Sequence, residues 1–272
     1  GVRHPNAPRS LALKPMHCGG AASEIDLERF RREADILLRI RHPNVVTVHE
    51  RGDSPHGLYL VSDLVEGNDL KVMLRTGPLP PLRSAQIVRE LAGAVQALHD
   101  NHVLHRDLKP DNVMVTERGV LKLTDFGLVR DLDPSMSRTQ LTKTGVYLGS
   151  PGFWSPEQAG GKLAQIGVRT DVYGLGAVLF ALLSGRPPNV GETLLEILAS
   201  TREPKPKPST FNPRVPAWLD RVVARTLATH PNDRLADPTE LAEALAAGDV
   251  AITGIGSRAL WVASILGVVL VV

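Results

Sequence analysis

Two polar clusters on either side of a short predicted hairpin constrain this chain more than any other feature. The first is the run HRDLKPDN at residues 105–112, and the second is DFG at residues 125–127. Residues 113–123 between them form two short apolar runs around a turn that contains glycine, which is typical of paired strands. An antiparallel hairpin returns the chain to the end at which it began, so we expect Asn112 and Asp125 to lie side by side.

This juxtaposition suits a metal ion and phosphate chemistry. Mg²⁺ accepts a few carboxylate or amide oxygens together with substrate phosphates, so Asn112 and Asp125 are the predicted metal ligands. Asp107 lies on the loop just before the hairpin, where its carboxylate could orient a hydroxyl nucleophile. Lys109 beside it could offset negative charge on a phosphoryl group during transfer.

The order of apolar patterns along the chain predicts an α+β fold. Strand-like runs come early, at residues 10–13, 45–48 and 58–61. Helical periodicity predicts helices from residue 23 to just before Pro43 and over residues 84–100, 171–184, 217–229 and 239–247. The helix over 171–184 is apolar almost all round, which indicates burial. Together these patterns indicate a small sheet-rich lobe followed by a larger helical lobe.

Charge and cysteine content exclude several classes of function. The 272 residues include 31 basic and 29 acidic side chains, and only 4% are aromatic, so nothing favours nucleic-acid binding. A single cysteine, Cys18, rules out an internal disulfide and a cysteine-based metal cluster. One lone thiol also fits a reducing compartment.

HRDLKPDN followed by DFG resembles the catalytic loop and metal-binding motif of eukaryotic-type (Hanks-type) serine/threonine protein kinases, and the resemblance extends over residues 11–247. It implies a two-lobed protein-kinase fold that transfers the γ-phosphoryl group of ATP to protein Ser or Thr. It also implies Asp107 as catalytic base, with Mg²⁺ (or Mn²⁺) held by Asn112 and Asp125. Lys109 and Ser150 favour Ser/Thr over Tyr specificity.

A carboxylate on a buried helical stripe predicts an ion pair in the small lobe. Glu33 shares a helical face with Leu37 and Ile40, where an unpaired charge is costly. The run ending at Lys14 resembles the family's lysine strand, which implies that Lys14 pairs with Glu33 and holds the ATP phosphates. The alternative is a partly exposed glutamate and a solvated lysine.

The resemblance also implies a nucleotide-binding hinge at residues 61–65. Backbone groups there would meet adenine, and Ser62 would control access to a pocket behind it. Asp69 is expected either to reach the ribose or to cap a helix. The residues expected to bind the nucleotide are Lys14, Val61, Asp63, Val65, Asp69 and Met114.

Residues 149–157, GSPGFWSPE, resemble the family's substrate-docking segment and the motif that follows it. This segment favours a protein substrate over a small molecule. By the same resemblance, Glu157 pairs with Arg234 as a structural clamp, and Asp171 caps the buried helix and braces the catalytic loop. A plain helix cap at Asp171 is compatible with that role.

Regulation is expected in the loop over residues 128–148. In the family, the arginine at the position of Arg106 binds a phosphate on this loop, which here offers Thr139, Thr142 and Thr144. We expect autophosphorylation at Thr142 or Thr144. The alternative is an ordinary flexible polar loop.

The family's glycine-rich loop is not readable in residues 1–13. Either the chain is a piece of a longer protein, as a start at Gly1 suggests, or the protein lacks this loop. A pseudokinase or scaffold that binds nucleotide without transfer therefore stays open. A small-molecule phosphotransferase is a separate alternative, which predicts activity on sugars or antibiotics but not on protein.

Residues 259–272 form a charge-free apolar run preceded by Arg258 and containing Trp261. We expect a truncated N-lobe at 1–66, a C-lobe at 67–247, a juxtamembrane linker at 248–258 and the start of a transmembrane helix at 259–272. A buried helix or edge element is the alternative. This arrangement resembles bacterial receptor-type kinases and implies a single-pass membrane protein with a cytoplasmic kinase domain and possible homodimers.

Overall fold

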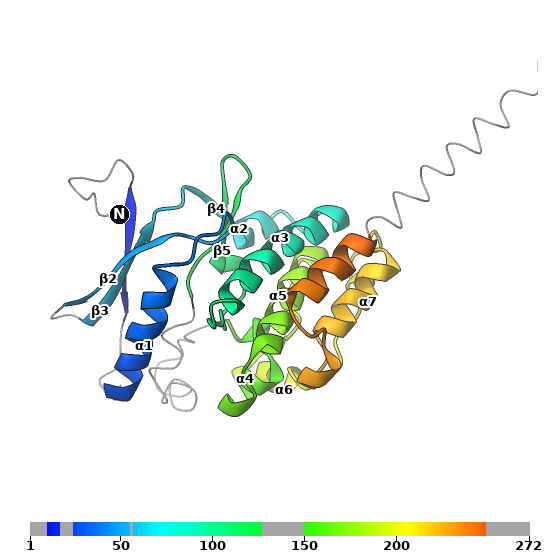
Figure 1. Cartoon of the computed structure of the whole chain (residues 1–272). Helices are drawn as coiled ribbons and strands as arrows, with labels where there is room; N and C mark the ends of the chain where they lie inside the picture. The colour runs from blue at the N-terminus through cyan, green and yellow to red at the C-terminus, as the bar shows by residue number, and fades with distance from the viewer. Residues whose placement is uncertain (1–9, 17–23, 55–56, 127–149, 249–272) are drawn as a thin grey trace, which may run out of the picture.

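The computed structural model describes residues 10–16, 24–54, 57–126 and 150–248. Figure 1 shows a sheet with one helix beside it at one end and a mostly helical body at the other. The predicted α+β class and two-lobed arrangement are therefore confirmed.

The smaller lobe is a three-stranded antiparallel sheet in the order β1-β3-β2. Its strands are β1 (Leu11–Met16), β2 (Val48–Ser54) and β3 (Gly57–Asp63), and helix α1 (Glu24–Leu37) lies beside them. Leu58 and Leu60 alternate with less buried neighbours along β3, which is the pattern of a strand with one covered face.

The strand expected over residues 45–48 is wrong in its extent. Strand β2 begins only at Val48, and Val45 instead forms a parallel bridge with Leu123 in the larger lobe. The apolar run at Val45 and Val46 reflects burial at this junction between the lobes rather than membership of the small sheet.

A second antiparallel sheet, in the order β4-β5-β6, lies at the edge of the larger lobe. It contains β4 (Gly67–Asp69), β5 (Val113–Thr116) and β6 (Leu121–Leu123). The predicted hairpin is the β5–β6 pair, in which Val113 faces Leu123. Strand β4 has no sequence signal, because Gly67, Asn68 and Asp69 carry no apolar alternation.

Helices make up the rest of the larger lobe. They are α2 (Leu70–Leu74), α3 (Pro81–His99), α4 (Pro156–Ala159), α5 (Val168–Ser184), α6 (Leu194–Ser200), α7 (Ala217–Thr226) and a helix over residues 238–248. Single 3₁₀ turns lie at Pro110–Asn112, Pro151–Phe153, Leu163–Gln165, Pro208–Thr210 and Pro231–Asp233. As predicted, α5 is central: it is buried from Thr170 to Leu183 and packs against both α3 and α7.

None of the helices in the described ranges has both the length and the apolarity required to cross a bilayer. Apart from residue 248, which ends the last helix, the expected linker at 248–258 and the expected transmembrane segment at 259–272 lie outside these ranges.

Candidate active site

The β5–β6 hairpin brings the two predicted metal ligands to one end of the second sheet. Thr124 donates its backbone N–H and its hydroxyl to the carbonyl oxygen of Asn112, at 2.9 and 3.1 Å. Since Asp125 follows Thr124 directly, Asn112 and Asp125 leave the hairpin at the same end. The predicted juxtaposition is confirmed.

Asp107 is held by two side chains from its own loop. Lys109 Nζ lies 3.0 Å from Asp107 Oδ2, and Asn112 Nδ2 donates to the same oxygen at 3.0 Å and to the Asp107 carbonyl at 2.7 Å. The two side chains fix the orientation of the Asp107 carboxylate. Asp107, Lys109 and Asn112 therefore form one cluster, as the sequence predicts.

His105 links this loop to the segment that carries Asp125. Its Nε2 lies 3.0 Å from the carbonyl oxygen of Thr124, and Asp107 donates its backbone N–H to Nδ1 at 3.3 Å. The carbonyl can only accept, so the ring carries its proton on Nε2. Complete burial lowers the pKa of His105, against the opposing charges of Asp171 and Asp107, and favours this neutral form.

The Asp171 carboxylate holds the backbone of the catalytic loop by hydrogen bonds. Its carboxylate accepts the backbone N–H groups of His105 and Arg106, each at 2.8 Å, and lies 2.8 Å from His99 Nε2. Burial alone would raise the pKa of Asp171, but the hydrogen bond and charge of His99 and the Arg106 N–H outweigh it and lower that pKa. The predicted bracing contact of Asp171 is confirmed, but the predicted cap is wrong, because α5 begins at Val168 and its N-cap residue is Gly167.

The loop also packs directly against α5 at Gly174. A Cβ built at Gly174 would lie 2.8 Å from Leu108 Cβ, so only glycine lets the loop and helix approach this closely.

Two residues of the site have left-handed backbone conformations that non-glycine residues rarely adopt. The φ angle is 61° at Arg106 and 58° at Asp125. Such conformations persist where surrounding contacts over-determine them, and they are concentrated at functional sites. The hydrogen bond from the Arg106 N–H to Asp171 supplies such a contact at Arg106, and the contact with Lys14 supplies one at Asp125.

The predicted pairing of Lys14 with Glu33 is wrong in this structure. Lys14 Nζ lies 2.7 Å from Asp125 Oδ1, and Glu33 Oε1 faces Arg106 Nη1 at 3.9 Å. The carboxylate does meet the cation that its partly buried position requires, but the position of α1 directs it to the catalytic loop. Lys14 thus contacts a predicted metal ligand instead of the α1 carboxylate.

The donor set fits a hard divalent cation. Asn112 directs its amide nitrogen to Asp107, and within the described ranges no group donates to its oxygen Oδ1. The Asp125 side chain is 50% exposed, so its carboxylate is accessible from solvent. One amide and one carboxylate suit Mg²⁺, which would take its remaining oxygens from nucleotide phosphates and water.

The docking segment is tied to the larger lobe by a buried ion pair. Arg234 donates to both carboxylate oxygens of Glu157, at 2.7 and 2.8 Å, and Thr170 adds a hydrogen bond at 2.8 Å. The side chains of Arg234 and Glu157 are 0% and 1% exposed. The predicted Glu157–Arg234 clamp is confirmed.

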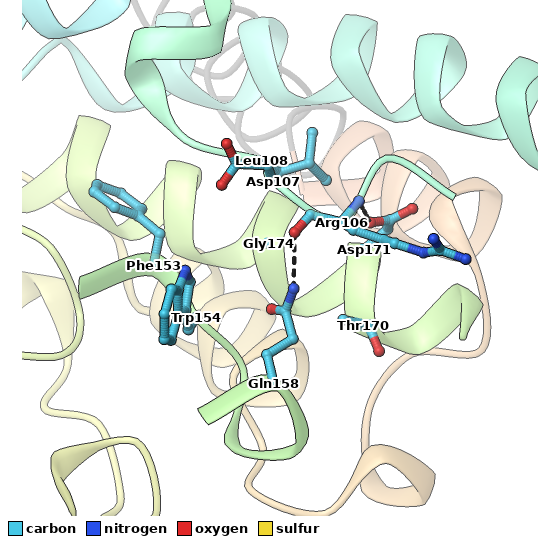
Figure 2. Close-up of a pocket in the computed structure, with 9 residues that line it drawn as sticks. All are labelled: Arg106, Asp107, Leu108, Phe153, Trp154, Gln158, Thr170, Asp171 and Gly174. Carbon is cyan, nitrogen blue, oxygen red and sulfur yellow. Dashed lines mark hydrogen bonds between the residues drawn. The ribbon is translucent and has the colours of Figure 1, made fainter. Parts of the chain in front are cut away.

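Gln158 is a site residue that the sequence did not reveal as such. It completes a capping box with Ser155 at the start of α4, and its Nε2 donates to the carbonyl oxygen of Arg106 at 2.7 Å (Figure 2). Figure 2 shows Gln158, Phe153 and Trp154 lining one small cavity with Asp107 and Leu108. The docking segment and the catalytic loop therefore share a cavity.

The hinge residues lie where β3 ends. Asp63 pairs with His49 at 2.7 Å, and the N–H of Leu64 donates to Ser10. Asp69 caps α2 by accepting the Val72 N–H at 2.7 Å, so the capping alternative is confirmed, whereas contact with a ribose stays a prediction. The expected roles of Val61, Ser62, Val65 and Met114 toward a nucleotide also stay predictions. Gly127, Thr139, Thr142 and Thr144 lie outside the described residues.

Residues 2–246 match the model of the protein kinase domain family. This chain belongs to the protein kinases.

Curated relatives place the kinase in the serine/threonine class. It is 36% identical over 228 residues to the serine/threonine-protein kinase PrkC of Bacillus subtilis, covering 83% of this chain and 34% of PrkC. It is 35% identical over 231 residues to PknL of Mycobacterium bovis, covering 84% of this chain and 56% of PknL. The kinase thus spans a third to just over half of the length of these relatives.

A solved structure agrees with this assignment. The kinase domain of PknI from Mycobacterium tuberculosis is 31% identical, with a TM-score of 0.71 over 90% of this chain and 88% of that chain. The predicted family, fold and serine/threonine kinase class are confirmed.

Proposed function

We propose that this kinase transfers the γ-phosphoryl group of ATP to serine and threonine hydroxyls of proteins, with Asp107 as the base that orients the acceptor. The observation that carries the proposal is the cluster of Asp107, Lys109 and Asn112 at the end of the β5–β6 hairpin, beside Asp125. In the reaction, a bond forms between the acceptor oxygen and the γ-phosphorus, and the bond from that phosphorus to the β–γ bridging oxygen breaks.

Each side chain has a distinct task. Asp107 accepts the hydroxyl proton, while Lys109, 3.0 Å from its carboxylate, offsets negative charge on the transferred group. Asn112 holds Asp107 by its amide nitrogen and offers its oxygen, with Asp125, to the metal. Lys14 binds the α- and β-phosphates once the nucleotide separates it from Asp125.

We assign the metal as Mg²⁺ or Mn²⁺ bound together with ATP, because Asn112 and Asp125 offer only oxygen ligands. When bound, such an ion neutralises charge on the phosphates. Catalysis then depends mainly on positioning and charge, which is the general character of phosphoryl transfer by kinases.

The test is phosphate transfer from labelled ATP to a mixture of serine, threonine and tyrosine peptides by the full-length protein. Asp107→Asn should lower the rate on the order of 10²- to 10⁴-fold while the unfolding midpoint stays unchanged. Asp100→Asn, at an exposed carboxylate beyond α3, is the matched control and should retain full activity. Nucleotide binding without transfer by the wild type would instead identify a pseudokinase.

We also propose that phosphorylation of the loop over residues 128–148 activates the kinase. This proposal is supported by Arg106, whose backbone is fixed by Asp171 and Gln158 and whose charge can pair with a phosphate. The loop offers three threonines as acceptors, Thr139, Thr142 and Thr144. Phosphopeptide mapping after incubation with Mg-ATP tests it, and absence of phosphate from this loop contradicts it.

We further propose that residues 259–272 attach the protein to the cell membrane. The charge-free run after Arg258, with Trp261 near its start, supports this attachment. We also propose that the protein forms homodimers in the membrane. Fractionation of cells that produce the protein with and without residues 259–272 tests attachment, and crosslinking in the membrane fraction tests the dimer. Equal recovery of both forms from the soluble fraction contradicts attachment.

A further inference from the structure

A buried hydrogen-bond network outside the kinase motifs connects the loop after α5 to the docking segment. Asn189 is 1% exposed, and its Nδ2 donates to the carbonyl oxygens of Gly152 and Trp154 at 3.1 and 3.0 Å. Its Oδ1 accepts the hydroxyl of Tyr173, in α5, at 3.1 Å. One side chain thus joins α5 to two backbone carbonyls of the docking segment.

The hydrogen-bonding capacity of Asn189 fixes its orientation. Both amide hydrogens point to carbonyl oxygens, which can only accept, and the amide oxygen faces a hydroxyl donor. A flipped amide would set its oxygen against the carbonyls of Gly152 and Trp154. The backbone N–H of Asn189 adds a further bond to Gly152, at 3.2 Å. Because buried polar groups are costly when unpaired, this network strongly favours one arrangement of the segment.

Packing enforces the same arrangement. A Cβ built at Gly152 would lie 2.9 Å from Pro187 Cβ and 3.2 Å from the Asn189 carbonyl oxygen. The docking segment therefore rests directly on residues 187–189 with no room for a side chain at Gly152.

The same helix also holds the catalytic loop. Tyr173 lies two residues after Asp171, which accepts the N–H groups of His105 and Arg106. Phe153 and Trp154, at the other end of the network, line the cavity that includes Asp107 (Figure 2). Helix α5 therefore sets the position of the docking segment relative to Asp107.

We propose that Asn189 is a positioning residue for the protein substrate: with Tyr173 it holds residues 152–154 in place beside Asp107. This inference rests on the proposed function. It predicts a defect that is selective for the protein substrate, because in the described part of the chain the network does not bond to Lys14, Val61 or Asp63, the predicted nucleotide-binding residues of the small lobe. A purely structural asparagine would instead affect nucleotide and protein substrate alike.

The experiment compares three variants with the wild-type full-length kinase. Asn189→Asp keeps the acceptor for Tyr173 but sets an oxygen against two carbonyls, Asn189→Ala removes the side chain, and Tyr173→Phe removes one hydroxyl and keeps the ring. Asn212→Ala is the matched control, since Asn212 is also buried and donates to an α5 carbonyl, that of Leu183, away from the docking segment.

We expect kcat/KM for a protein substrate to fall on the order of 10- to 100-fold in both Asn189 variants, with KM for ATP unchanged within about twofold. Tyr173→Phe should cause a smaller loss of about 3- to 10-fold, and it serves as the decisive variant if the Asn189 variants do not fold. A rise in KM for ATP that matches the loss toward protein, or an equal loss in Asn212→Ala, overturns the inference.

Amide hydrogen exchange separates this inference from the proposed function. Residues 150–155 should exchange faster in Tyr173→Phe and Asn189→Ala than in wild type, while residues 105–112 stay protected. If the wild type transfers no phosphate to protein, the proposed function fails, and faster exchange alone still supports Asn189 as the holder of the segment. Unchanged exchange in 150–155 overturns the inference whatever the activity.

Discussion

At the scale of single residues, Arg234 shows how a buried charge is retained in this kinase. Its five N–H donors all find acceptors: the two oxygens of Glu157 and the carbonyl oxygens of Ala228, Arg169 and Thr229. Its guanidinium also lies 4.9 Å from the centre of the Tyr173 ring. Lysine offers three donors from one point and cannot reproduce this planar set.

The Glu157–Arg234 pair predicts a specific dependence of stability on pH. Burial acts to raise the pKa of Glu157, but the hydrogen bonds and charge of Arg234 outweigh it and lower that pKa below the ordinary value of 4.5. A lowered folded-state pKa means that the stabilisation is complete above about pH 4.5 and is lost as pH falls through the folded-state pKa. Glu157→Gln should therefore lower the free energy of unfolding at pH 7 by about 3–5 kcal/mol and flatten its decline in acid.

Urea denaturation at pH 7 and at successively lower pH measures both effects. Glu28→Gln, at an exposed carboxylate that pairs with Arg32 one turn further along α1, is the control and should follow the wild-type profile. Parallel pH profiles for Glu157→Gln and wild type would contradict the assigned role of this pair.

Site residues differ in how far sequence could predict them. Asn112 and Asp125 were predictable because one short hairpin sets their relation, and hairpin geometry is local. The partner of Glu33 was not, since helical periodicity identifies the face that carries it but not the position of α1 against the catalytic loop. Asn189 gave no functional signal, because after Pro187 and Pro188 an asparagine is typical of any turn.

At the scale of elements, α5 is the support on which the site is built. Its Asp171 holds the catalytic loop, its Tyr173 holds Asn189, and its Gly174 admits Leu108. The helix was predictable in position and burial because it is apolar almost all round. Its contacts with the loops were not predictable from periodicity, since they depend on two individual side chains, Asp171 and Tyr173, and on the absence of a side chain at Gly174.

Two glycines in helix interiors should respond oppositely to alanine. At Gly174 a Cβ would clash with Leu108, so Gly174→Ala should destabilise the kinase by about 1–3 kcal/mol and lower activity by displacing the catalytic loop. At Gly93 in α3 the nearest atom lies 3.9 Å away, so Gly93→Ala should stabilise by about 0.5–1 kcal/mol with unchanged activity.

Thermal or urea unfolding of both variants, with kinase assays alongside, measures this contrast. Equal effects of the two substitutions would mean that helix propensity alone governs them and that the contact between Gly174 and Leu108 does not constrain the loop.

At the scale of the whole molecule, the contact between Lys14 and Asp125 joins the small sheet to the segment that carries a predicted metal ligand. Both side chains are about half exposed, at 44% and 50%, so solvent screens the pair and its contribution to stability is small. A ligand that binds between these groups should therefore stabilise the fold more than their direct contact does.

Mg-ATP should raise the unfolding midpoint of the full-length protein. Binding to the folded state alone contributes about 2.7 kcal/mol when the ligand exceeds its dissociation constant 100-fold. EDTA should remove most of this shift, and Asp125→Asn should reduce it, whereas Asp100→Asn should keep it. A shift that is unchanged by EDTA would contradict metal binding at Asn112 and Asp125.

The bridge between Val45 and Leu123 has a mechanical consequence. Val46 donates to the Leu123 carbonyl at 2.9 Å, and Leu123 donates to the Asn44 carbonyl at 2.7 Å, only two residues before Asp125. The connection from α1 to the small sheet is thus held in place next to Asp125, a predicted metal ligand. These hydrogen bonds restrain displacement of α1 relative to the larger lobe at residues 44–46, close to Asp125.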